Sequence, residues 1–196
     1  MSWAAGRRGI GLKPMQINSL VAVGLGAVFA TGFAAVGQAD DSAVPVNTVE
    51  ISDLLSTSGQ PPAAYFEVLA EQGFEIIVNL APPQSHGSLQ DEGGLVGEKG
   101  MTYVNIPVDW NGPEREQFEF FARLLSQNQA RKTLVHCQVG FRASTFTFLY
   151  RVIYLEQPAD EALEFVHQVW VPNDTWTEFA NEMLQANGVD FRLQND

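Results

Sequence analysis

Cysteine is almost absent from this sequence. Cys137 is the single cysteine among 196 residues, which excludes a disulfide within the chain. A free cysteine is often no more than a small buried core residue. In an exported protein, by contrast, an unpaired thiol indicates a reactive group. The cysteine count alone leaves both interpretations open.

Basic residues are also scarce. The chain has 11 Lys and Arg against 23 Asp and Glu, for a formal net charge of −12. Arg7, Arg8 and Lys13 lie in a segment that we expect to be removed, which leaves 8 basic and 23 acidic side chains, near −15. Such a surface repels nucleic acid and anionic membranes. We therefore predict no nucleic-acid partner, and an anionic substrate must be held by a local positive site.

The sequence lacks a glycine-rich nucleotide-binding loop and the ligand spacing of a zinc site. His86 lies in a polar loop and His167 is isolated on a predicted helix, whereas a metal site needs three or four convergent ligands. We predict neither a metal nor a cofactor.

Residues 1–39 have the pattern of an export signal. The opening "MSWAAGRRGIGLKPMQ" is positive and lacks acids, residues 14–39 carry no charge, and "GQA" before Asp40 offers the small residues that signal peptidase reads. We predict a cleaved signal peptide and a location in the bacterial periplasm or outside the cell. A retained N-terminal anchor is the alternative, and only that anchor would bring the protein to a membrane.

Residues 40–196 predict one α/β domain with a central, mostly parallel sheet flanked by helices and with extra helices at the C-terminus. Strands are expected over 47–52, 74–81, 101–109 and 132–137. Residues 56–60 are expected to form a turn before a helix that is opened by Pro61 and Pro62. Further helices are expected over 92–98, 112–129, 142–156, 159–170 and 173–188. Ligands of such sheets collect at the carboxyl ends of the strands.

Cys137 lies at such an end, between a buried strand and a helix. The unpaired N–H groups and the positive dipole end of the helix favour thiolate over thiol and form an anion cradle. Gly140 lets the loop bend, Arg142 adds a planar fork for two phosphate oxygens, and Ser144 is placed to donate to the thiolate as it leaves. The predicted phosphate-binding residues are Gln138, Val139, Gly140, Phe141, Ala143 and Ser144.

Phosphate transfer to sulfur also needs an acid that protonates the departing oxygen. Asp109, which ends the expected strand over 101–109, is the candidate, and Trp110 beside it is expected to shield the carboxyl and favour its protonated form. An ordinary turn residue is the alternative interpretation of Asp109. Rival acids on nearby loops are Asp91, Glu92, Glu114 and Glu116.

Residues from about 48 to 185 resemble the dual-specificity branch of the cysteine-dependent protein tyrosine phosphatases, and most of all its small bacterial members related to the DUF442 group. The resembling segments are "TSGQP", "GFEIIVNLAPP", "YVNIPVDW", "LVHCQVGFRAS" and "FLYRV". The resemblance implies that Cys137 is a nucleophile that forms a phosphocysteine, Arg142 a phosphate clamp, and Asp109 a general acid and then base. It also implies that His136 tunes the thiolate.

The loop departs from the family pattern in its length. Four residues separate Cys137 from Arg142, where the family has five, so that Ser144 is in register and Arg142 is one position early. A loop of this length resembles that of the rhodanese sulfurtransferases. The segments upstream of the loop favour a phosphatase that acts on phosphorylated protein or on a small phosphate ester. Two alternatives stay open: a sulfurtransferase with a persulfide on Cys137, and a module that binds phosphate or a phosphoprotein without turnover.

Overall fold

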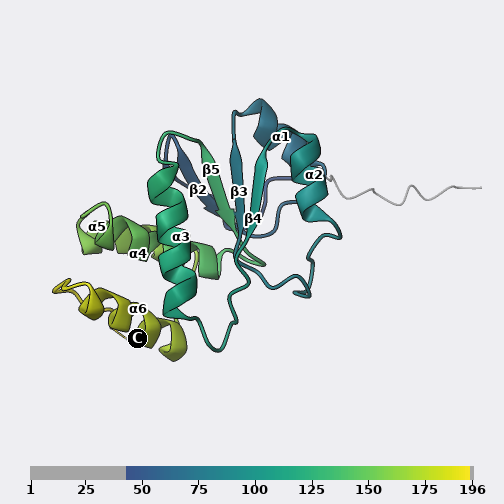
Figure 1. Ribbon diagram of the computed structural model, residues 1–196. Helices are drawn as coiled ribbons and strands as arrows, with labels where there is room; N and C mark the ends of the chain where they lie inside the picture. The colour runs from purple at the N-terminus through teal and green to yellow at the C-terminus, as the bar shows by residue number, and fades with distance from the viewer. Residues whose placement is uncertain (1–42, 195–196) are drawn as a thin grey trace, which may run out of the picture. The chain divides into compact units, whose positions relative to one another are not determined.

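The computed structural model describes residues 43–194, so the predicted export segment over 1–39 lies outside the described residues. The described part is a five-stranded sheet in the order β1-β2-β5-β3-β4 with six helices (Figure 1). The strands are β1 (Val49–Ser52), β2 (Leu55–Ser58), β3 (Ile76–Asn79), β4 (Thr102–Asn105) and β5 (Thr133–His136). The helices are α1 (Tyr65–Glu71), α2 (Glu92–Glu98), α3 (Arg115–Gln127), α4 (Phe141–Ile153), α5 (Ala159–His167) and α6 (Asp174–Ala186).

The predicted fold class is confirmed. Only β1 and β2 pair antiparallel, whereas β2–β5, β5–β3 and β3–β4 are parallel pairs. Alternate strand residues face opposite layers. Ile77 and Leu134 pack with α1 and α2, and Ile76, Val78 and Val135 pack in the larger core with α3 to α6 (Figure 1).

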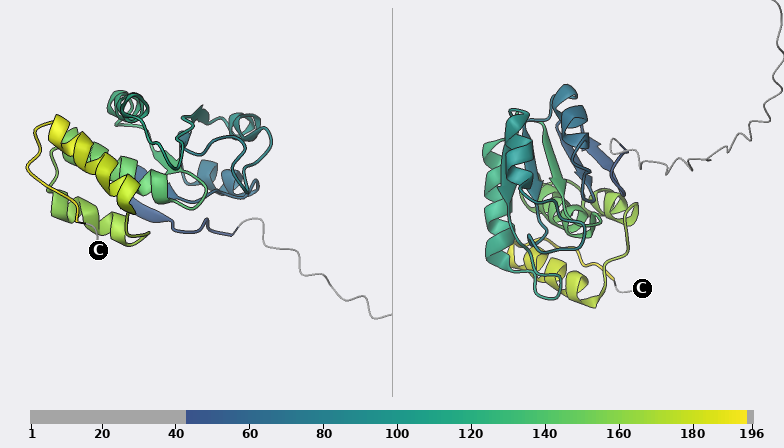
Figure 2. Two further views of the ribbon diagram at one scale, coloured as in Figure 1. Left: turned by 90° about the horizontal axis from the view of Figure 1, so that it is seen from below. Right: turned by 90° about the vertical axis from the view of Figure 1, so that its right-hand side faces the viewer.

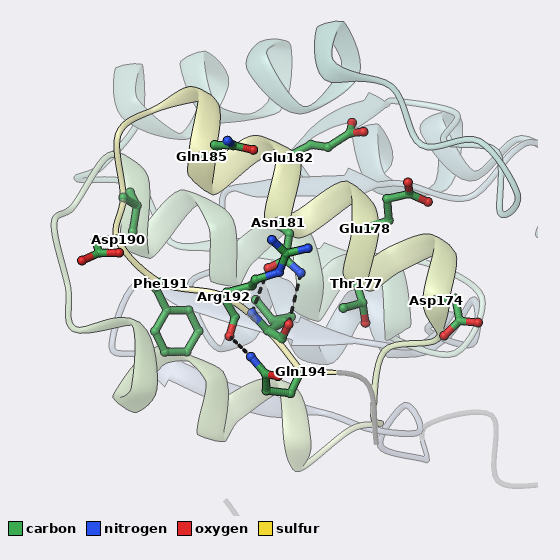
Figure 3. A pocket seen from close by; sticks show the side chains of 12 residues that line it. Asp174, Thr177, Glu178, Asn181, Glu182, Gln185, Asp190, Phe191, Arg192 and Gln194 are labelled. Atoms are coloured by element: carbon green, nitrogen blue, oxygen red, sulfur yellow. Dashed lines mark hydrogen bonds between the residues drawn. The ribbon is translucent and has the colours of Figure 1, made fainter.

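The C-terminal helices extend the larger layer. Both α5 and α6 contact α4, and Figure 2 shows the yellow α6 beside the green α4. The tail after α6 folds back along it, because the Asn181 amide donates to Leu193 O (3.1 Å) and accepts from Leu193 N (2.8 Å) (Figure 3). A groove of about 1180 Å³ lies between this tail and α6. None of the residues that line the groove belongs to the predicted site.

The predicted turn over 56–60 is wrong for its first three residues, which belong to β2. The segment is a strand although Ser56, Thr57 and Ser58 are all buried polar residues. Sequence periodicity identifies strands by buried apolar residues, and this one has none after Leu55. Its backbone pairs with β1 on one side and with β5 on the other.

The strand predicted over 101–109 ends earlier, at Asn105. Pro107 has no N–H to donate and interrupts the ladder. The extended chain still follows β3, because Ile106 N donates to Asn79 O (2.9 Å) and Val108 N donates to Leu80 O (3.1 Å). Asp109 therefore lies four residues beyond the strand, not at its last position.

The parallel strands end level with one another. His136 is in register with Ser58 and with Asn79, and Asn79 is in register with Asn105. The loops that follow β5, β3 and β4 therefore leave one edge of the sheet, which is the edge where ligands of such sheets bind. No helix within residues 43–194 has the length and apolar character that crossing a membrane requires.

Gly59 follows β2 and pairs with Val139 in the loop after β5. A Cβ there would meet Val46 Cγ2 at 2.6 Å and Gln138 O at 3.1 Å. We expect Gly59→Ala to lower the free energy of unfolding by about 1–3 kcal/mol, as overpacking does. The matched control is Gly97→Ala in α2, where a Cβ meets nothing within 4 Å and the helix gains up to about 1 kcal/mol. Urea unfolding measures both changes, and equal effects of the two substitutions would contradict the close approach.

Candidate active site

Cys137 follows the last residue of β5, and α4 begins four residues later at Phe141. Gly140 makes the turn with a φ of +90°, a conformation that glycine adopts without the strain of a side chain. Its N–H donates to Cys137 Sγ at 3.2 Å, and the sulfur is 0% exposed. The loop therefore brings a buried sulfur and a main-chain donor together at the start of a helix.

The carbonyl groups of the loop are held from outside. Gln60 N donates to Gln138 O (3.1 Å), and Asn47 Nδ2 donates to Val139 O (2.8 Å). In a trans peptide the N–H points opposite to the C=O. The N–H groups of Val139 and Gly140 are therefore turned toward the interior of the loop. The predicted cradle of main-chain donors is the arrangement that these contacts favour.

The Arg142 side chain is fixed against the segment that follows β4. It is 6% exposed, its Nε donates to Val108 O at 2.9 Å, and its guanidinium carbon lies 5.3 Å from the centre of the Trp110 ring. Within residues 43–194 its two Nη nitrogens have no hydrogen-bond partner, so they are the donors available to an oxyanion. The guanidinium is held inside the protein and does not extend into bulk water.

Asp109 and Trp110 lie in the same segment but face different surroundings. The Asp109 carboxylate is exposed and accepts a hydrogen bond from Asn111 N at 2.7 Å, which is the geometry of a turn. The Trp110 ring packs against Trp170 and Trp176, with ring centres 5.4 and 5.5 Å away. The Trp110 ring is thus the surface against which the Arg142 guanidinium packs. The acid role of Asp109 and its shielding by Trp110 stay predictions.

The other predicted loop residues divide into a buried and a partly exposed group. Ala143 is fully buried in the core, while Gln138, Val139 and Phe141 are partly exposed. The Phe141 ring stacks on Trp170 with 4.6 Å between ring centres. Ser144 Oγ donates to Phe141 O (3.0 Å) and accepts from Trp170 Nε1 (3.2 Å). Its predicted donation to a leaving thiolate would require the bond to Phe141 O to break.

His136, directly before Cys137, is completely buried and faces a buried carboxylate. Its Nε2 lies 3.3 Å from Glu92 Oε1. Burial lowers the pKa of His136 below the ordinary value of 6.5, although Glu92 and the Cys137 backbone act in the opposite direction. His136 is therefore neutral over the physiological pH range.

Sequence reasoning considered Glu92 only as a rival acid on a loop, whereas it is 5% exposed and highly connected. It accepts hydrogen bonds from Gln60 Nε2 (2.6 Å), Asn79 Nδ2 (2.7 Å) and Tyr103 Oη (2.9 Å). Burial, followed by the Glu92 charge, raises the pKa of Tyr103. We call Gln60, Asn79, Glu92, Tyr103 and His136 the Glu92 cluster. An acid in the first turn of a helix is usually solvated, so no local signal identified it.

Within residues 43–194, the remaining candidates form no hydrogen bond or ion pair with Cys137 or Arg142. Glu114 and Glu116 are exposed at the start of α3, where the Glu114 and Gln117 side chains form a capping box. Asp91 caps α2 by accepting from Gly94 N. His86 and His167 are exposed. Among the residues that the structure describes, no three His, Cys, Asp or Glu side chains converge as metal ligands would.

Comparison with known proteins places this geometry among phosphatases. Residues 28–181 match the family model described as "DSP-PTPase phosphatase fused to NAD+ Kinase". The chain is 31% identical to the DUF442 protein of Shewanella putrefaciens CN-32, with a TM-score of 0.67 over 74% of this chain and 92% of that one. PTPMT1, at 15% identity, shares the fold, with a TM-score of 0.62 over 71% of this chain and 95% of its own.

A second kind of relative is much longer. The chain is 33% identical over 111 residues to the Beta-lactamase hydrolase-like protein of Agrobacterium fabrum. The match covers 53% of this chain and 25% of that protein. The chain therefore spans about a quarter of the length of this curated relative, and the similarity concerns one part of it.

The lowered pKa of His136 predicts how stability depends on pH. Below pH 6.5 the unfolded chain protonates this histidine while the folded protein holds it neutral, so the unfolded state binds more protons. The free energy of unfolding should fall as the pH drops from 6.5 toward the folded-state pKa, by at most about 1.4 kcal/mol per pH unit. Urea unfolding between pH 7.5 and 5.5 measures this slope.

Glu92 and Cys137 are ionisable neighbours of His136, so variants are needed to show which group causes the pH dependence of the free energy of unfolding. His136→Gln should flatten it, whatever its effect on stability at pH 7.5. His86→Gln removes an exposed histidine and should leave the slope as it is. A slope that is unchanged in His136→Gln would show that another group carries it.

Proposed function

The chain belongs to the family of DSP-PTPase phosphatases fused to NAD+ kinase, and on this premise we propose that it hydrolyses phosphomonoesters through a phosphocysteine on Cys137. The observation that carries the proposal is the contact between Gly140 N–H and Cys137 Sγ at the start of α4, together with the burial of the Arg142 side chain from the first turn of that helix. A nucleophile among oxyanion donors suits a phosphate ester because the same donors hold the transferring group. The substrates we propose are phosphorylated protein or a small phosphate ester.

The proposed reaction has two steps. In the first, the Cys137 thiolate attacks phosphorus, the bond to the ester oxygen breaks, and Asp109 gives its proton to that oxygen. In the second, water attacks the phosphocysteine, Asp109 accepts a proton from this water, and the thiolate leaves. The Arg142 Nη groups and the loop N–H groups hold the three non-bridging oxygens throughout.

Local donors, not the overall charge, are expected to bind the substrate. The formal net charge of −12 disfavours the approach of an anion from a distance. The few basic side chains make the buried Arg142 and the oriented main-chain N–H groups the main source of positive potential in the loop. Salt that screens the protein charge should therefore assist rather than oppose binding of a phosphate ester.

We also propose that the enzyme acts after export, in the periplasm or outside the cell. This proposal rests on the sequence of residues 1–39 alone. If the N-terminal segment is retained, the phosphatase domain acts beside a membrane.

One alternative has its own structural support. The exposed Asp109 carboxylate is engaged by its own turn, and the Cys137 sulfur is completely buried. Both features suit a module that binds phosphate without turnover. The sulfurtransferase alternative rests only on the spacing between Cys137 and Arg142.

Removal of the nucleophile separates these functions. Cys137→Ser should abolish hydrolysis of p-nitrophenyl phosphate, because serine is a far weaker nucleophile at neutral pH, while phosphate binding, measured by calorimetry, is retained. A wild-type protein that binds phosphate without turnover would instead be the binding module. Formation of a persulfide from thiosulfate, in the absence of phosphate hydrolysis, would identify a sulfurtransferase.

The acid role of Asp109 predicts a dependence on the leaving group. Asp109→Asn should lower kcat for an alkyl phosphate by about 10²–10⁴-fold, the usual contribution of a general acid. The loss should be smaller for p-nitrophenyl phosphate, because its leaving oxygen needs little protonation. Asp160→Asn, at an exposed aspartate in the first turn of α5, is the control. An equal loss with both substrates would remove Asp109 from this role.

A further inference from the structure

We propose that Glu92 is a positioning residue that fixes the phosphate-binding loop through Gln60 and His136. The inference rests on the proposed function, because it concerns the same loop. It assigns Glu92 no contact with substrate.

Glu92 is unusual in its burial. Among residues 43–194 it is the only Asp or Glu whose side chain is buried. Removing a carboxylate from water costs several kcal/mol, and well-packed apolar residues often stabilise a fold as well or better. A buried carboxylate with this many partners is therefore better explained by the geometry that it fixes than by the stability that it adds.

The two carboxylate oxygens of Glu92 have different partners. Oε2 accepts from Asn79 Nδ2 and Tyr103 Oη, which belong to β3 and β4. Oε1 accepts from Gln60 Nε2 and lies 3.3 Å from His136 Nε2. Oε2 thus connects Glu92 to the sheet. Oε1 faces Gln60, which contacts the phosphate-binding loop, and His136, which directly precedes it.

Gln60 gives the first connection to the loop. Its side chain donates to Glu92 Oε1 at 2.6 Å, and its backbone N–H donates to Gln138 O at 3.1 Å. The bond to Gln138 O is one of the two that turn loop carbonyls outward and loop N–H groups inward. Without Glu92 as the acceptor of its side chain, Gln60 is less restrained, and so is its backbone hydrogen bond to Gln138 O.

His136 gives the second connection. It is bonded directly to Cys137 in the chain, and its own carbonyl accepts from Leu80 N at 2.8 Å. His136 Nε2 lies 3.3 Å from Glu92 Oε1, and neither ring nitrogen has a hydrogen-bond partner among the described residues, so the carboxylate is a close polar contact and not a hydrogen-bond acceptor of the ring. This contact restricts how the buried ring can turn beside Cys137.

A positioning role and a purely electrostatic role predict opposite signs for Glu92→Gln. If Glu92 positions the loop, the substitution disorders the N–H donors, thiolate forms at a higher pH, and phosphate binds about tenfold more weakly, as expected for a lost charged hydrogen bond. If Glu92 acts only as a nearby negative charge, its removal makes thiolate form at a lower pH and tightens phosphate binding. Glu98→Gln, at an exposed glutamate of the same helix, is the matched control and should change neither quantity.

The single cysteine makes the first measurement specific. Ultraviolet titration of thiolate absorbance, with Cys137→Ser as the blank, reports on Cys137 alone and needs no turnover. Calorimetry with inorganic phosphate gives the affinity. A thiolate midpoint that is unchanged or lower in Glu92→Gln would overturn the proposal. If the wild-type protein does not hydrolyse phosphate esters, that result counts against the proposed function, but the titration and the phosphate-binding measurement still test the role of Glu92.

Two milder variants decide the matter if Glu92→Gln does not fold. Gln60→Met removes a partner of Oε1, and Tyr103→Phe removes a partner of Oε2. Both should lower the melting temperature, but Gln60→Met should weaken phosphate binding at least threefold more than Tyr103→Phe. Equal effects on phosphate binding would mean that Glu92 stabilises the sheet without positioning the loop, and would also overturn the proposal.

Discussion

The hydrogen bond from Gly140 N–H to Cys137 Sγ is the interaction on which the candidate site depends. It forms only if the chain turns from a buried strand into a helix within four residues, and the positive φ of Gly140 makes that turn possible. The same turn places Arg142 in the first turn of α4, from which its Nε reaches Val108 O. One short piece of backbone thus sets the positions of the Cys137 sulfur, the main-chain donors and the Arg142 guanidinium. Any change that widens this turn affects all three groups together.

The parts of this arrangement that are local in sequence could be predicted. Apolar runs before Cys137 and the apolar stripe of α3 identified the core elements, and the helix over 92–98 was placed at its observed bounds. The sequence does not predict the strand β2, because Ser56, Thr57 and Ser58 carry no apolar signal, although its backbone pairs with a strand on each side and the three side chains are buried. The early end of β4 follows from Pro107, which the expected strand over 101–109 contains.

The contacts of the site that are distant in sequence could not be predicted. Glu92 contacts residues 11 to 44 positions away in the chain, and no spacing rule connects them. The same holds for Trp110, which lies next to Asp109 in sequence but packs on Trp170 and Trp176. A residue's neighbour in the chain is a poor guide to its environment in a loop, because successive side chains there leave in different directions. The register of the sheet, with Asn79 level with His136, is what brings the Glu92 cluster together.

Burial explains why such a second layer of contacts matters here. Cys137 and Arg142 are both withdrawn from water, so water cannot reorient to stabilise charge on the sulfur or on the phosphate that we propose this loop binds. Fixed donors must replace that solvation, and they do so well only if they already point at the charge. In an open site, solvent would correct a small displacement of the loop. In this buried site, the loop carbonyls need hydrogen bonds from outside the loop. Gln60 N donates to Gln138 O and Asn47 Nδ2 donates to Val139 O, and the Glu92 carboxylate in turn accepts from the Gln60 side chain.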